Sequence, residues 1–454
     1  MATKSAAKTS AAKTSAAKTS AAKKSAPANG RRVAVIDGVR TPFLRAGTEF
    51  NDLMAYDLGR YAVSGLLGKT GLDPYVVDMV MMGCVIADPA TSNVAREIVL
   101  ATELPDRVPA YTISEACISA NQAICNAVDQ IARGYGDVAI AGGTDITSDV
   151  PIRYQKRMRQ KFLRTQKAKG LKDYYEIFHD VKPADLVPDP PGIADFFTGL
   201  SMGGACDRIC ARLGVTREEQ DAFAARSHQL AHQAAESGLF DDEVISVAPP
   251  PHFKPVTRDN GVRGDTTYEK MAKLRPAFDK NYGTVTAGNA SFLTDGAAAV
   301  LLMSEEKAKE LGYKPKAYII GHAFRGTDPL EEMLLGQTYA TPTALARAGI
   351  TFEDLGVLEI HEAFAGQMVA TVKLLESKEF GESLGLGGAI AKKVNQDILN
   401  IHGGSLSIGH PFGATGARLI HTCANRMRRE NKRYGLVAAC ALSGLGNATV
   451  LELA

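Results

Sequence analysis

One sequence unit occurs twice in this chain, and it constrains the fold more than any other feature. The first copy is a helical apolar pattern over 117–131, a Gly-Tyr-Gly stop at 134–136, and a short apolar strand at 137–141 that ends in two glycines. The second copy begins at Gly413–Gly416, ends its helix in a cluster of Arg and Lys, and continues in the strand 436–439. Such a duplication predicts two similar α/β halves packed together, each with a mixed sheet between helices.

The stretch between the two copies breaks this rhythm. It contains a basic run, a Pro-rich loop and a helix expected at Arg217–Ser237. We therefore expect an inserted domain, lying over the first half. The expected boundaries are an N-terminal half at 31–147, completed by about 294–312, an inserted domain at 148–293, and a C-terminal half at 313–454.

Residues 1–30 form a separate low-complexity segment. They repeat the unit AAKTS and contain lysines but no acids, and a five-residue repeat places no apolar stripe along a helix. We expect a disordered cationic tail.

Composition limits the class of protein. Hydrophobic residues make up 45% of the 454 residues, which is enough for a large core. The net charge of +2 gives no reason to expect a nucleic-acid partner. No apolar run reaches the roughly 18 residues that a membrane span needs.

Cysteine usage indicates the compartment. Seven scattered cysteines without a secretory signal predict a reducing environment, the cytoplasm, with the mitochondrial matrix as the alternative. Cys206 and Cys210 are spaced as neighbours on a helix, and no partner pair lies at zinc-finger spacing. We expect two buried small side chains there rather than a metal site.

Four Cys and His residues lie at the edges of the duplicated units. Cys117 precedes the first helix, where free N–H groups and the helix dipole favour a thiolate. His361 follows the strand-like segment 357–360, and His410 lies between glycines. Cys440 ends the second strand, before a Gly-rich turn whose N–H groups could bind an oxyanion. Each alone is more often structural; together they supply a nucleophile, a base, a second acid/base and an oxyanion site.

Four ordered segments resemble the thiolase family. They are ACISANQ at 116–122, GTVTAGNAS at 283–291 with Asp-Gly at 295–296, HEAF at 361–364, and GSLSIGHPFGATG at 404–416. The resemblance covers about 31–454. It implies an α/β fold of two halves with mixed five-stranded sheets in αβαβα layers, plus an inserted loop domain that covers CoA.

Two further segments are most similar, within the family, to the β subunits of fatty-acid trifunctional enzymes. They are SDVPIR at 148–153 and GQTYATP at 336–342. Those β subunits are long-chain 3-ketoacyl-CoA thiolases. The resemblance therefore implies an acetyl-CoA acyltransferase.

The resemblance also implies roles for the site residues. Cys117 would take the acyl group as a thioester after His410 removes its proton. Cys440 would protonate the departing acetyl-CoA carbanion, or abstract the α-proton in reverse. His361, where many thiolases have Asn, would bind the enolate oxygen with His410. The backbone N–H groups of Cys117 and Leu442 would hold the other oxyanion.

Coenzyme A and acyl-CoA are implied as substrates, with no tightly bound cofactor and no metal. Ser291 and Met202 match family positions near the CoA pantetheine. The run 153–172 contains nine Lys or Arg and no acid, with Tyr154, Met158 and Phe162 at four-residue spacing. It is typical of a solvated helix face; binding of the CoA 3′-phosphate through Arg153, or docking on an anionic membrane, are the alternatives.

The expected function is cleavage of 3-ketoacyl-CoA with CoA, giving acetyl-CoA and a shortened acyl-CoA in fatty-acid β-oxidation. The alternatives are a biosynthetic acetyl-CoA C-acetyltransferase and an inactive scaffold subunit. One departure bears on the latter: Leu442-Ser443 stand where the family has Gly or Ala and then Gly, and a turn that needs φ > 0 would disfavour Leu442. The resemblance implies a homodimer or larger assembly and a trifunctional α-type hydratase/dehydrogenase partner.

Overall fold

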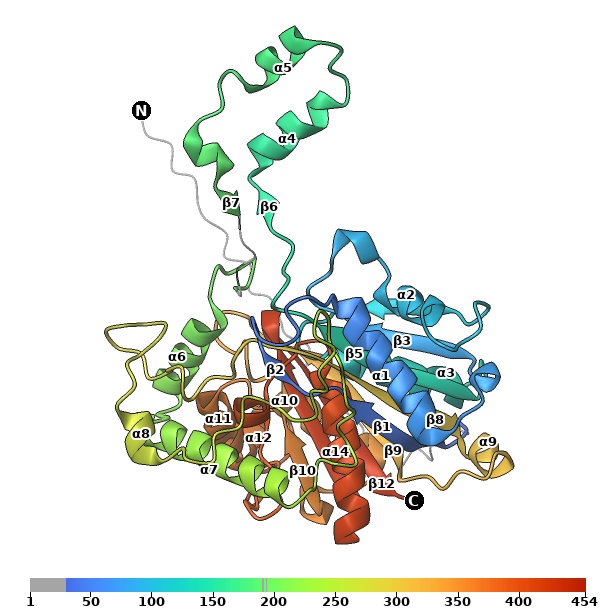
Figure 1. The fold of residues 1–454 in the computed structure, drawn as a ribbon. Helices are drawn as coiled ribbons and strands as arrows, with labels where there is room; N and C mark the ends of the chain where they lie inside the picture. The colour runs from blue at the N-terminus through green and yellow to red at the C-terminus, as the bar shows by residue number, and fades with distance from the viewer. Residues whose placement is uncertain (1–29, 190–191, 193) are drawn as a thin grey trace, which may run out of the picture. The chain divides into compact units, whose positions relative to one another are not determined.

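The computed structural model describes residues 30–189, 192 and 194–454. The expected tail therefore lies outside the described residues, apart from Gly30. Residues Arg31–Ala454 form one compact unit (Figure 1).

The first half contains a mixed sheet of five strands in the order β4-β3-β5-β8-β1. β3 runs parallel to β4 and β5, and β8 runs antiparallel to β5 and β1. A two-residue strand, β2 (Leu44–Arg45), also pairs with β8. The five strands are β1 (Val33–Arg40), β3 (Met79–Gly83), β4 (Ala110–Ile113), β5 (Val138–Asp145) and β8 (Thr294–Ser304).

The second half repeats this topology in the order β10-β11-β12-β9. β10 is parallel to β11, and β12 is antiparallel to both of its neighbours. These strands are β9 (Ala317–Gly326), β10 (Val357–Ile360), β11 (Tyr434–Ala441) and β12 (Leu445–Leu453). The same order and directions in both halves confirm the duplication inferred from the two sequence units.

The second sheet differs from the first in its fifth position. That position is reduced to a single bridge between Leu358 and Leu399. The next residue, Asn400, has a positive φ of 46°, a conformation that turns the chain out of a strand. β1 and β9 pair at two positions and join both sheets edge to edge.

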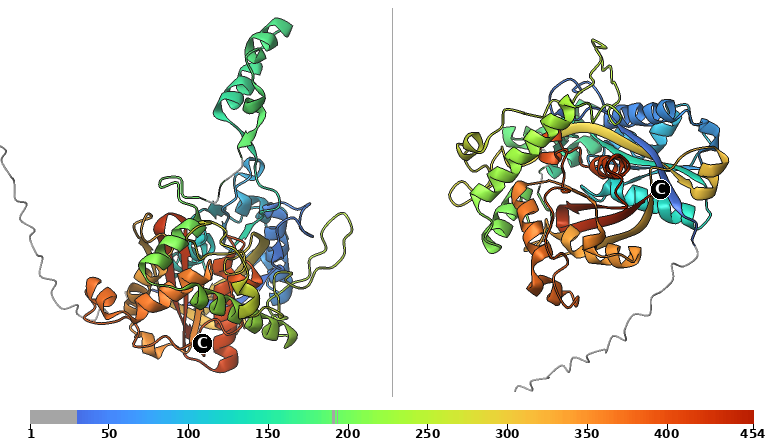
Figure 2. Two further views of the ribbon diagram at one scale, coloured as in Figure 1. Left: turned by 90° about the vertical axis from the view of Figure 1, so that its left-hand side faces the viewer. Right: turned by 90° about the horizontal axis from the view of Figure 1, so that it is seen from below.

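Helices complete an αβαβα arrangement (Figure 2). α3 (Ser119–Ala132) and α14 (Thr415–Glu430) contact each other between the sheets. α1 (Ala55–Thr70) and α2 (Val94–Leu100) pack on the first half, and α10 (Gly336–Ala348) packs on the second. Every residue of α14 from Thr415 to Met427 is buried, as expected for a helix enclosed on all sides.

The strand β8 shows how this layering arises from the sequence. Its side chains alternate between two cores because successive residues of a strand point to opposite faces. Ala297, Ala299 and Leu301 contribute to the core under α1, whereas Ala298 and Val300 contribute to the core around α3 and α14. A strand buried on both faces needs a continuous apolar run, and β8, which is buried along its whole length, is apolar from Ala297 to Met303.

The inserted stretch contacts the first half, where Val244 bridges Arg40 of β1, but it also packs on the second half. Its helices α6 (Met202–Arg212) and α7 (Arg217–Glu236) pack on α11 (Ala365–Glu376) of the second half. The reason is an apolar face of α6, including the buried Cys206 and Cys210, which meets Ala363, Phe364 and Ala370 in one core cluster. The two sulfurs lie 3.9 Å apart, which confirms the expected buried pair.

The short helices of the main unit include three more. They are α8 (Tyr268–Ala272), α9 (Glu305–Glu310) and α12 (Lys378–Ser383). In the described residues, no helix is both long and apolar enough to cross a membrane.

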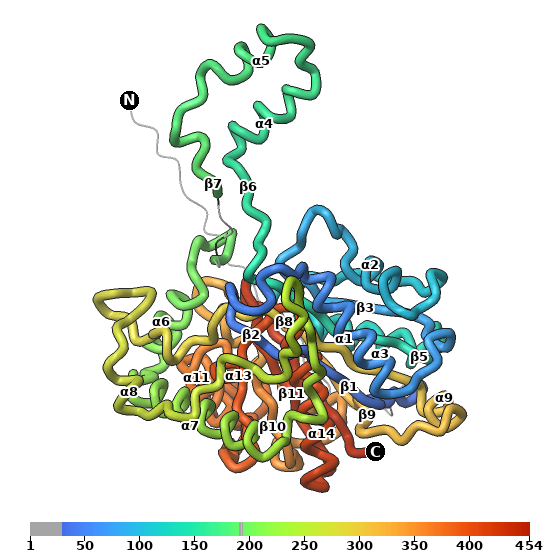
Figure 3. The backbone as a smooth tube through the Cα atoms, viewed as in Figure 1, coloured from blue at the N-terminus to red at the C-terminus, as the bar shows by residue number. Residues whose placement is uncertain are grey.

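The basic run begins a helical arm, defined here as residues 153–189 (Figure 3). It contains β6 (Arg153–Tyr154), α4 (Lys156–Thr165), α5 (Leu171–Phe178) and β7 (Pro188–Asp189). Tyr154 thus lies in a strand and not on the helix, although its ring still meets that of Phe162 at 5.2 Å.

Candidate active site

Cys117 lies on a strained turn just before α3. The preceding residue, Ala116, has a positive φ of 47°, which is unfavourable for a side chain with a Cβ. The Ser119 hydroxyl holds the turn: it donates to the Ala116 carbonyl at 2.7 Å and accepts the Glu115 N–H at 2.8 Å. Strain held by neighbouring bonds in this way is common at functional sites.

Two histidines from distant segments meet beside this turn. His361 follows β10 directly, and its N–H donates to Ala438 of β11 at 2.8 Å. His410 follows the short helix α13 (Ser405–Ile408), and its N–H donates to the Thr294 hydroxyl at 3.0 Å. The two rings lie 4.1 Å apart between centroids.

The nucleophile candidate and both imidazoles form one cluster. One sulfur or nitrogen atom from each of Cys117, His361 and His410 lies within 4.8 Å of the other two. Burial raises the pKa of Cys440, on β11, and the nearby Cys117 sulfur raises it further, so Cys440 is a neighbour of this cluster. Cys117 is the most exposed of the four, at 8%. The four predicted residues therefore come together.

Burial changes the expected state of Cys117. It raises the pKa of the Cys117 thiol to about 12, although the N–H groups of Leu442 and of Cys117 itself act in the opposite direction. These N–H groups act in the expected direction, but desolvation outweighs them, so the expected thiolate is not the state of the free protein. The resting group is a thiol, and it needs a base.

His410 is positioned to be that base. Its Nδ1 lies 2.7 Å from the Thr415 hydroxyl, which donates its one hydrogen to the Pro411 carbonyl at 2.9 Å. Thr415 must therefore accept a hydrogen from Nδ1, so the Nε2 atom carries a free lone pair. Burial, and then the charge of Arg418, lower the pKa of His410 to about 3, so the ring is neutral at pH 7. Nε2 has no other partner in the described residues.

The turn after Cys440 supplies a backbone donor. The Leu442 N–H faces the Cys117 sulfur and lowers its pKa. The residue with positive φ is Ser443, at 65°, and not Leu442. The unfavourable positive φ that we expected at Leu442 therefore occurs at Ser443 instead. The Ser443 hydroxyl donates to Asp195 at 2.5 Å.

Comparisons with known proteins agree with this geometry. The family model described as the thiolase N-terminal domain matches residues 33–306, and the thiolase C-terminal domain matches 313–453. The chain belongs to the thiolase family. Members of this family are acyltransferases, and the αβαβα fold is theirs.

Individual relatives cover nearly the whole chain. The mitochondrial trifunctional enzyme subunit beta of Bos taurus is 48% identical over 94% of this chain and 89% of its own length. A 3-ketoacyl-CoA thiolase of Serratia proteamaculans is 45% identical over 94% and 98%. The crystal structure of the Bacillus anthracis acetyl-CoA acetyltransferase has a TM-score of 0.79 at 32% identity, covering 94% of this chain and 100% of that one.

Sequence reasoning about this thiolase missed a buried carboxylate. Asp145, at the end of β5, accepts N–H groups from Val85, Ile86 and Gly413, the last at 2.5 Å. Burial raises its pKa to about 6, and its charge contributes to the high pKa of Cys117. Its only sequence signal was an acid that ends an otherwise apolar strand.

The predicted CoA-contacting residues lie in two places. Met202 begins α6 and shares a core cluster with Cys440. The Ser291 N–H donates to the Ala363 carbonyl at 2.9 Å, inside the HEAF segment. Arg153 instead lies in the helical arm, where it pairs with Asp189 at 3.2 Å.

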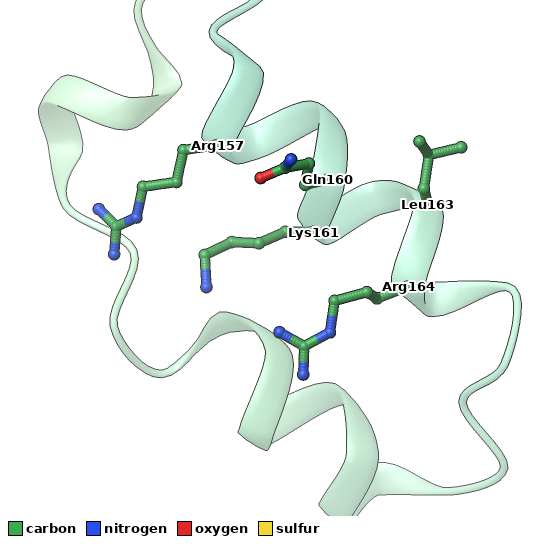
Figure 4. A pocket seen from close by; sticks show the side chains of 5 residues that line it. All are labelled: Arg157, Gln160, Lys161, Leu163 and Arg164. Atoms are coloured by element: carbon green, nitrogen blue, oxygen red, sulfur yellow. The ribbon is translucent and has the colours of Figure 1, made fainter.

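Two cavities in the described chain lie away from the four predicted catalytic residues. One, of about 470 Å³, is in the helical arm and is lined by residues of α4 (Figure 4). These are Arg157, Gln160, Lys161, Leu163 and Arg164. The other, of about 170 Å³, lies behind the nucleophile turn and includes Glu115, Ile118 and Phe324.

The Cys117, His361 and His410 cluster is also the one group of three in the described residues that could hold a metal ion. Sulfur and imidazole nitrogen suit Zn²⁺. The Arg418 guanidinium, however, depresses the pKa of both imidazoles, and the same positive charge opposes a divalent cation. The arrangement favours proton transfer instead.

Proposed function

We propose that this thiolase cleaves 3-ketoacyl-CoA with CoA and yields acetyl-CoA and an acyl-CoA shortened by two carbons, in fatty-acid β-oxidation. The observation that carries the proposal is the cluster of Cys117 with two imidazoles, with the Leu442 N–H aimed at the sulfur. The degradative direction is supported by relatives named trifunctional enzyme subunit beta and 3-ketoacyl-CoA thiolase.

In the first half-reaction the Cys117 sulfur attacks the 3-keto carbon while His410 Nε2 takes the thiol proton. The bond between C2 and C3 breaks, and its electron pair remains on the acetyl-CoA fragment as an enolate. Cys440 gives its proton to C2 of that enolate, which leaves as acetyl-CoA. His361 and His410 face the enolate oxygen; one lost donor of this kind typically costs about 10²–10³ in rate.

In the second half-reaction CoA releases the acyl group. The CoA thiol gives its proton to the Cys440 thiolate and attacks the thioester carbon. The N–H groups of Cys117 and Leu442 stabilise the tetrahedral oxyanion. The Cys117 sulfur leaves and recovers its proton from His410, so the enzyme returns to its starting state.

The region 148–293 is proposed to cover CoA, as a domain inserted between halves at 31–147 and 313–454. Met202 and Ser291 support this, because one neighbours Cys440 and the other bonds to the HEAF segment. Arg153 is the weaker candidate for binding the CoA 3′-phosphate, because its guanidinium already pairs with the Asp189 carboxylate.

For assembly we propose a homodimer or larger oligomer that associates with a hydratase/dehydrogenase subunit. β4 lies at the edge of the sheet order, with Tyr111 exposed on it, and can pair with a further strand. The relatives named as subunits of a trifunctional enzyme support the second partner. A reducing compartment suits seven free cysteines; bacterial relatives fit the cytoplasm and mitochondrial ones fit the matrix.

The decisive experiment follows CoA-dependent cleavage of acetoacetyl-CoA and of a long-chain 3-ketoacyl-CoA. We expect wild type to cleave at least one, Cys117→Ala to form no acyl-enzyme, and Cys440→Ala to lose cleavage by at least 10²-fold. Cys423→Ala, which removes an equally buried sulfur of α14, is the matched control. A wild type that cleaves neither substrate and forms no acyl-enzyme would support the scaffold alternative.

A further inference from the structure

The two imidazoles of the site are anchored by different hydroxyl groups. His410 Nδ1 faces Thr415, whose hydrogen is committed to the Pro411 carbonyl. His361 Nδ1 lies 3.0 Å from the Ser405 hydroxyl. The hydrogen on Ser405 therefore decides which nitrogen of His361 is protonated, because a neutral imidazole carries one N–H.

Arg418 constrains that hydrogen. Its Nη2 donates to the Ser405 oxygen at 3.1 Å. A guanidinium has donors only, so Ser405 must be the acceptor in this contact. The one acceptor that the Ser405 hydroxyl meets in the described residues is His361 Nδ1. Donation from Ser405 to Nδ1 satisfies both contacts, whereas the opposite arrangement leaves a buried hydroxyl hydrogen without an acceptor, which typically costs about 1–3 kcal/mol.

The surroundings keep Arg418 in place. Arg418 is 2% exposed, and its Nη1 lies 3.8 Å from Glu359, the penultimate residue of β10. A chain of contacts thus runs from Glu359 on β10 to Arg418 on α14, then to Ser405 on α13, and ends at His361, the residue that follows β10. Burial, and then His410 and Arg418, depress the pKa of His361 well below its usual range, so the ring is neutral.

We propose that Ser405, held by Arg418, is a positioning residue that places the single proton of His361 on Nε2, so that this ring acts as a fixed hydrogen-bond donor to the substrate enolate. His410 has the opposite tautomer and presents a lone pair at its own Nε2. Both Nε2 atoms are buried and unpartnered among the described residues, as expected for groups that await a substrate. The chemical consequence rests on the proposed function; the tautomers do not.

The tautomers can be measured in the free protein. Labelling with ¹⁵N-histidine distinguishes protonated from unprotonated ring nitrogens at pH 7, with His361→Asn and His410→Asn used for assignment. We expect the proton of His361 on Nε2 and that of His410 on Nδ1. A His361 protonated on Nδ1 overturns the inference, whatever the activity of the protein. A wild type that fails to cleave 3-ketoacyl-CoA overturns the proposed function and leaves this measurement valid.

A double-mutant cycle tests whether Ser405 acts through His361. Ser405→Ala should lower 3-ketoacyl-CoA cleavage about 10-fold in the wild-type background. In the His361→Asn background, where an amide N–H replaces the imidazole donor and no tautomer exists, the same change should cost less than about 3-fold. Equal losses in both backgrounds would show a merely structural serine.

Three controls separate a positioning role of Ser405 from general damage to the fold. Transfer of an acyl group between acyl-CoA and a second thiol forms no enolate, so Ser405→Ala should retain it within about 3-fold. Ser405→Thr, which keeps the hydroxyl, should restore cleavage. Ser407→Ala removes another buried hydroxyl of α13, one that bonds to Gly404 and Ser227 and not to an imidazole, and should retain both reactions. Loss of both reactions together in Ser405→Ala and Ser405→Thr would contradict the proposal.

Discussion

At the scale of single residues, Ser443 shows how this chain accommodates an unusual turn beside the site. Its φ of 65° costs roughly 1–2 kcal/mol for a residue with a Cβ. The hydroxyl offsets part of this cost by donating to Asp195, and that bond lowers the pKa of Asp195. The preceding Leu442 N–H is thereby aimed at Cys117.

Substitution of Ser443 should separate strain from bonding. Ser443→Ala keeps the unfavourable φ and loses the bond, so we expect kcat for cleavage to fall about 3- to 10-fold. Ser443→Gly removes the steric cost and should restore most of the rate. Asp195→Ala should behave as Ser443→Ala does. Steady-state cleavage of acetoacetyl-CoA measures all three, and an unchanged rate in Ser443→Ala would contradict a role for the bond.

At the scale of elements, the helical arm carries less net positive charge than its basic run, residues 153–172, indicates. The nine Lys and Arg of 153–172 are followed by five acids up to Asp189. Arg153, Arg157, Lys161 and Lys172 are paired with these acids. The charges that remain are accompanied by exposed apolar side chains, with Leu163 at 63% and Leu171 at 89%. Cationic and apolar groups together suit the anionic surface of a membrane.

We propose docking of this arm on anionic membranes, and charge reversal tests it. Four of the exposed cations on or after α4 that have no acidic partner are Arg159, Arg164, Lys167 and Lys169. Their joint change to Glu should weaken binding to anionic vesicles at low salt at least 100-fold, since each nearby cation contributes about 1 kcal/mol. Co-sedimentation measures it.

The matched control for the arm reverses four exposed lysines outside it, Lys280, Lys314, Lys392 and Lys393. These should change vesicle binding by less than about 10-fold. The docking proposal is wrong if the wild-type protein does not bind anionic vesicles at low salt, or if the arm and control variants weaken binding equally. The arm would then be an ordinary solvated helix.

At the scale of the whole molecule, buried histidines couple stability to pH. Burial lowers the pKa of His228 and His402 to about 4 and that of His410 to about 3, and it also depresses His361. A histidine of this kind favours the folded state at pH values above its pKa in the unfolded chain, about 6.5. That contribution is lost as the pH falls toward its pKa in the folded protein. The pKa of Asp145, raised to about 6, and that of His322, raised to about 10, act with the opposite sign and offset a part of this loss.

The free energy of unfolding should therefore decrease between pH 7 and pH 5. Each buried histidine contributes at most roughly 2 kcal/mol over this interval, because the unfolded chain takes up a proton that the folded chain does not. Urea denaturation at the two pH values measures the change. A midpoint that is constant or higher at pH 5 would show that these rings are protonated in the folded protein.

Local sequence determined much of this protein. The two copies of helix, stop and strand became α3 with β5 and α14 with β11, within sheets of the same order. The four reactive side chains could be singled out together, because Cys117 precedes a helix, His361 follows a strand, His410 lies between glycines and Cys440 ends a strand. These features depend on neighbouring residues alone: hydrophobic periodicity and glycine stops act over a few positions.

Tertiary structure decided the chemistry of those side chains. Cys117 is a thiol, because burial raises its pKa more than the N–H groups of Leu442 and of Cys117 itself lower it. His361 and His410 differ in function because Ser405 and Thr415 bond to different third groups. α6 and α7 pack on the second half because an apolar face was available there. A pKa, a tautomer and a docking face depend on atoms brought together through space, and spacing along the chain does not specify them.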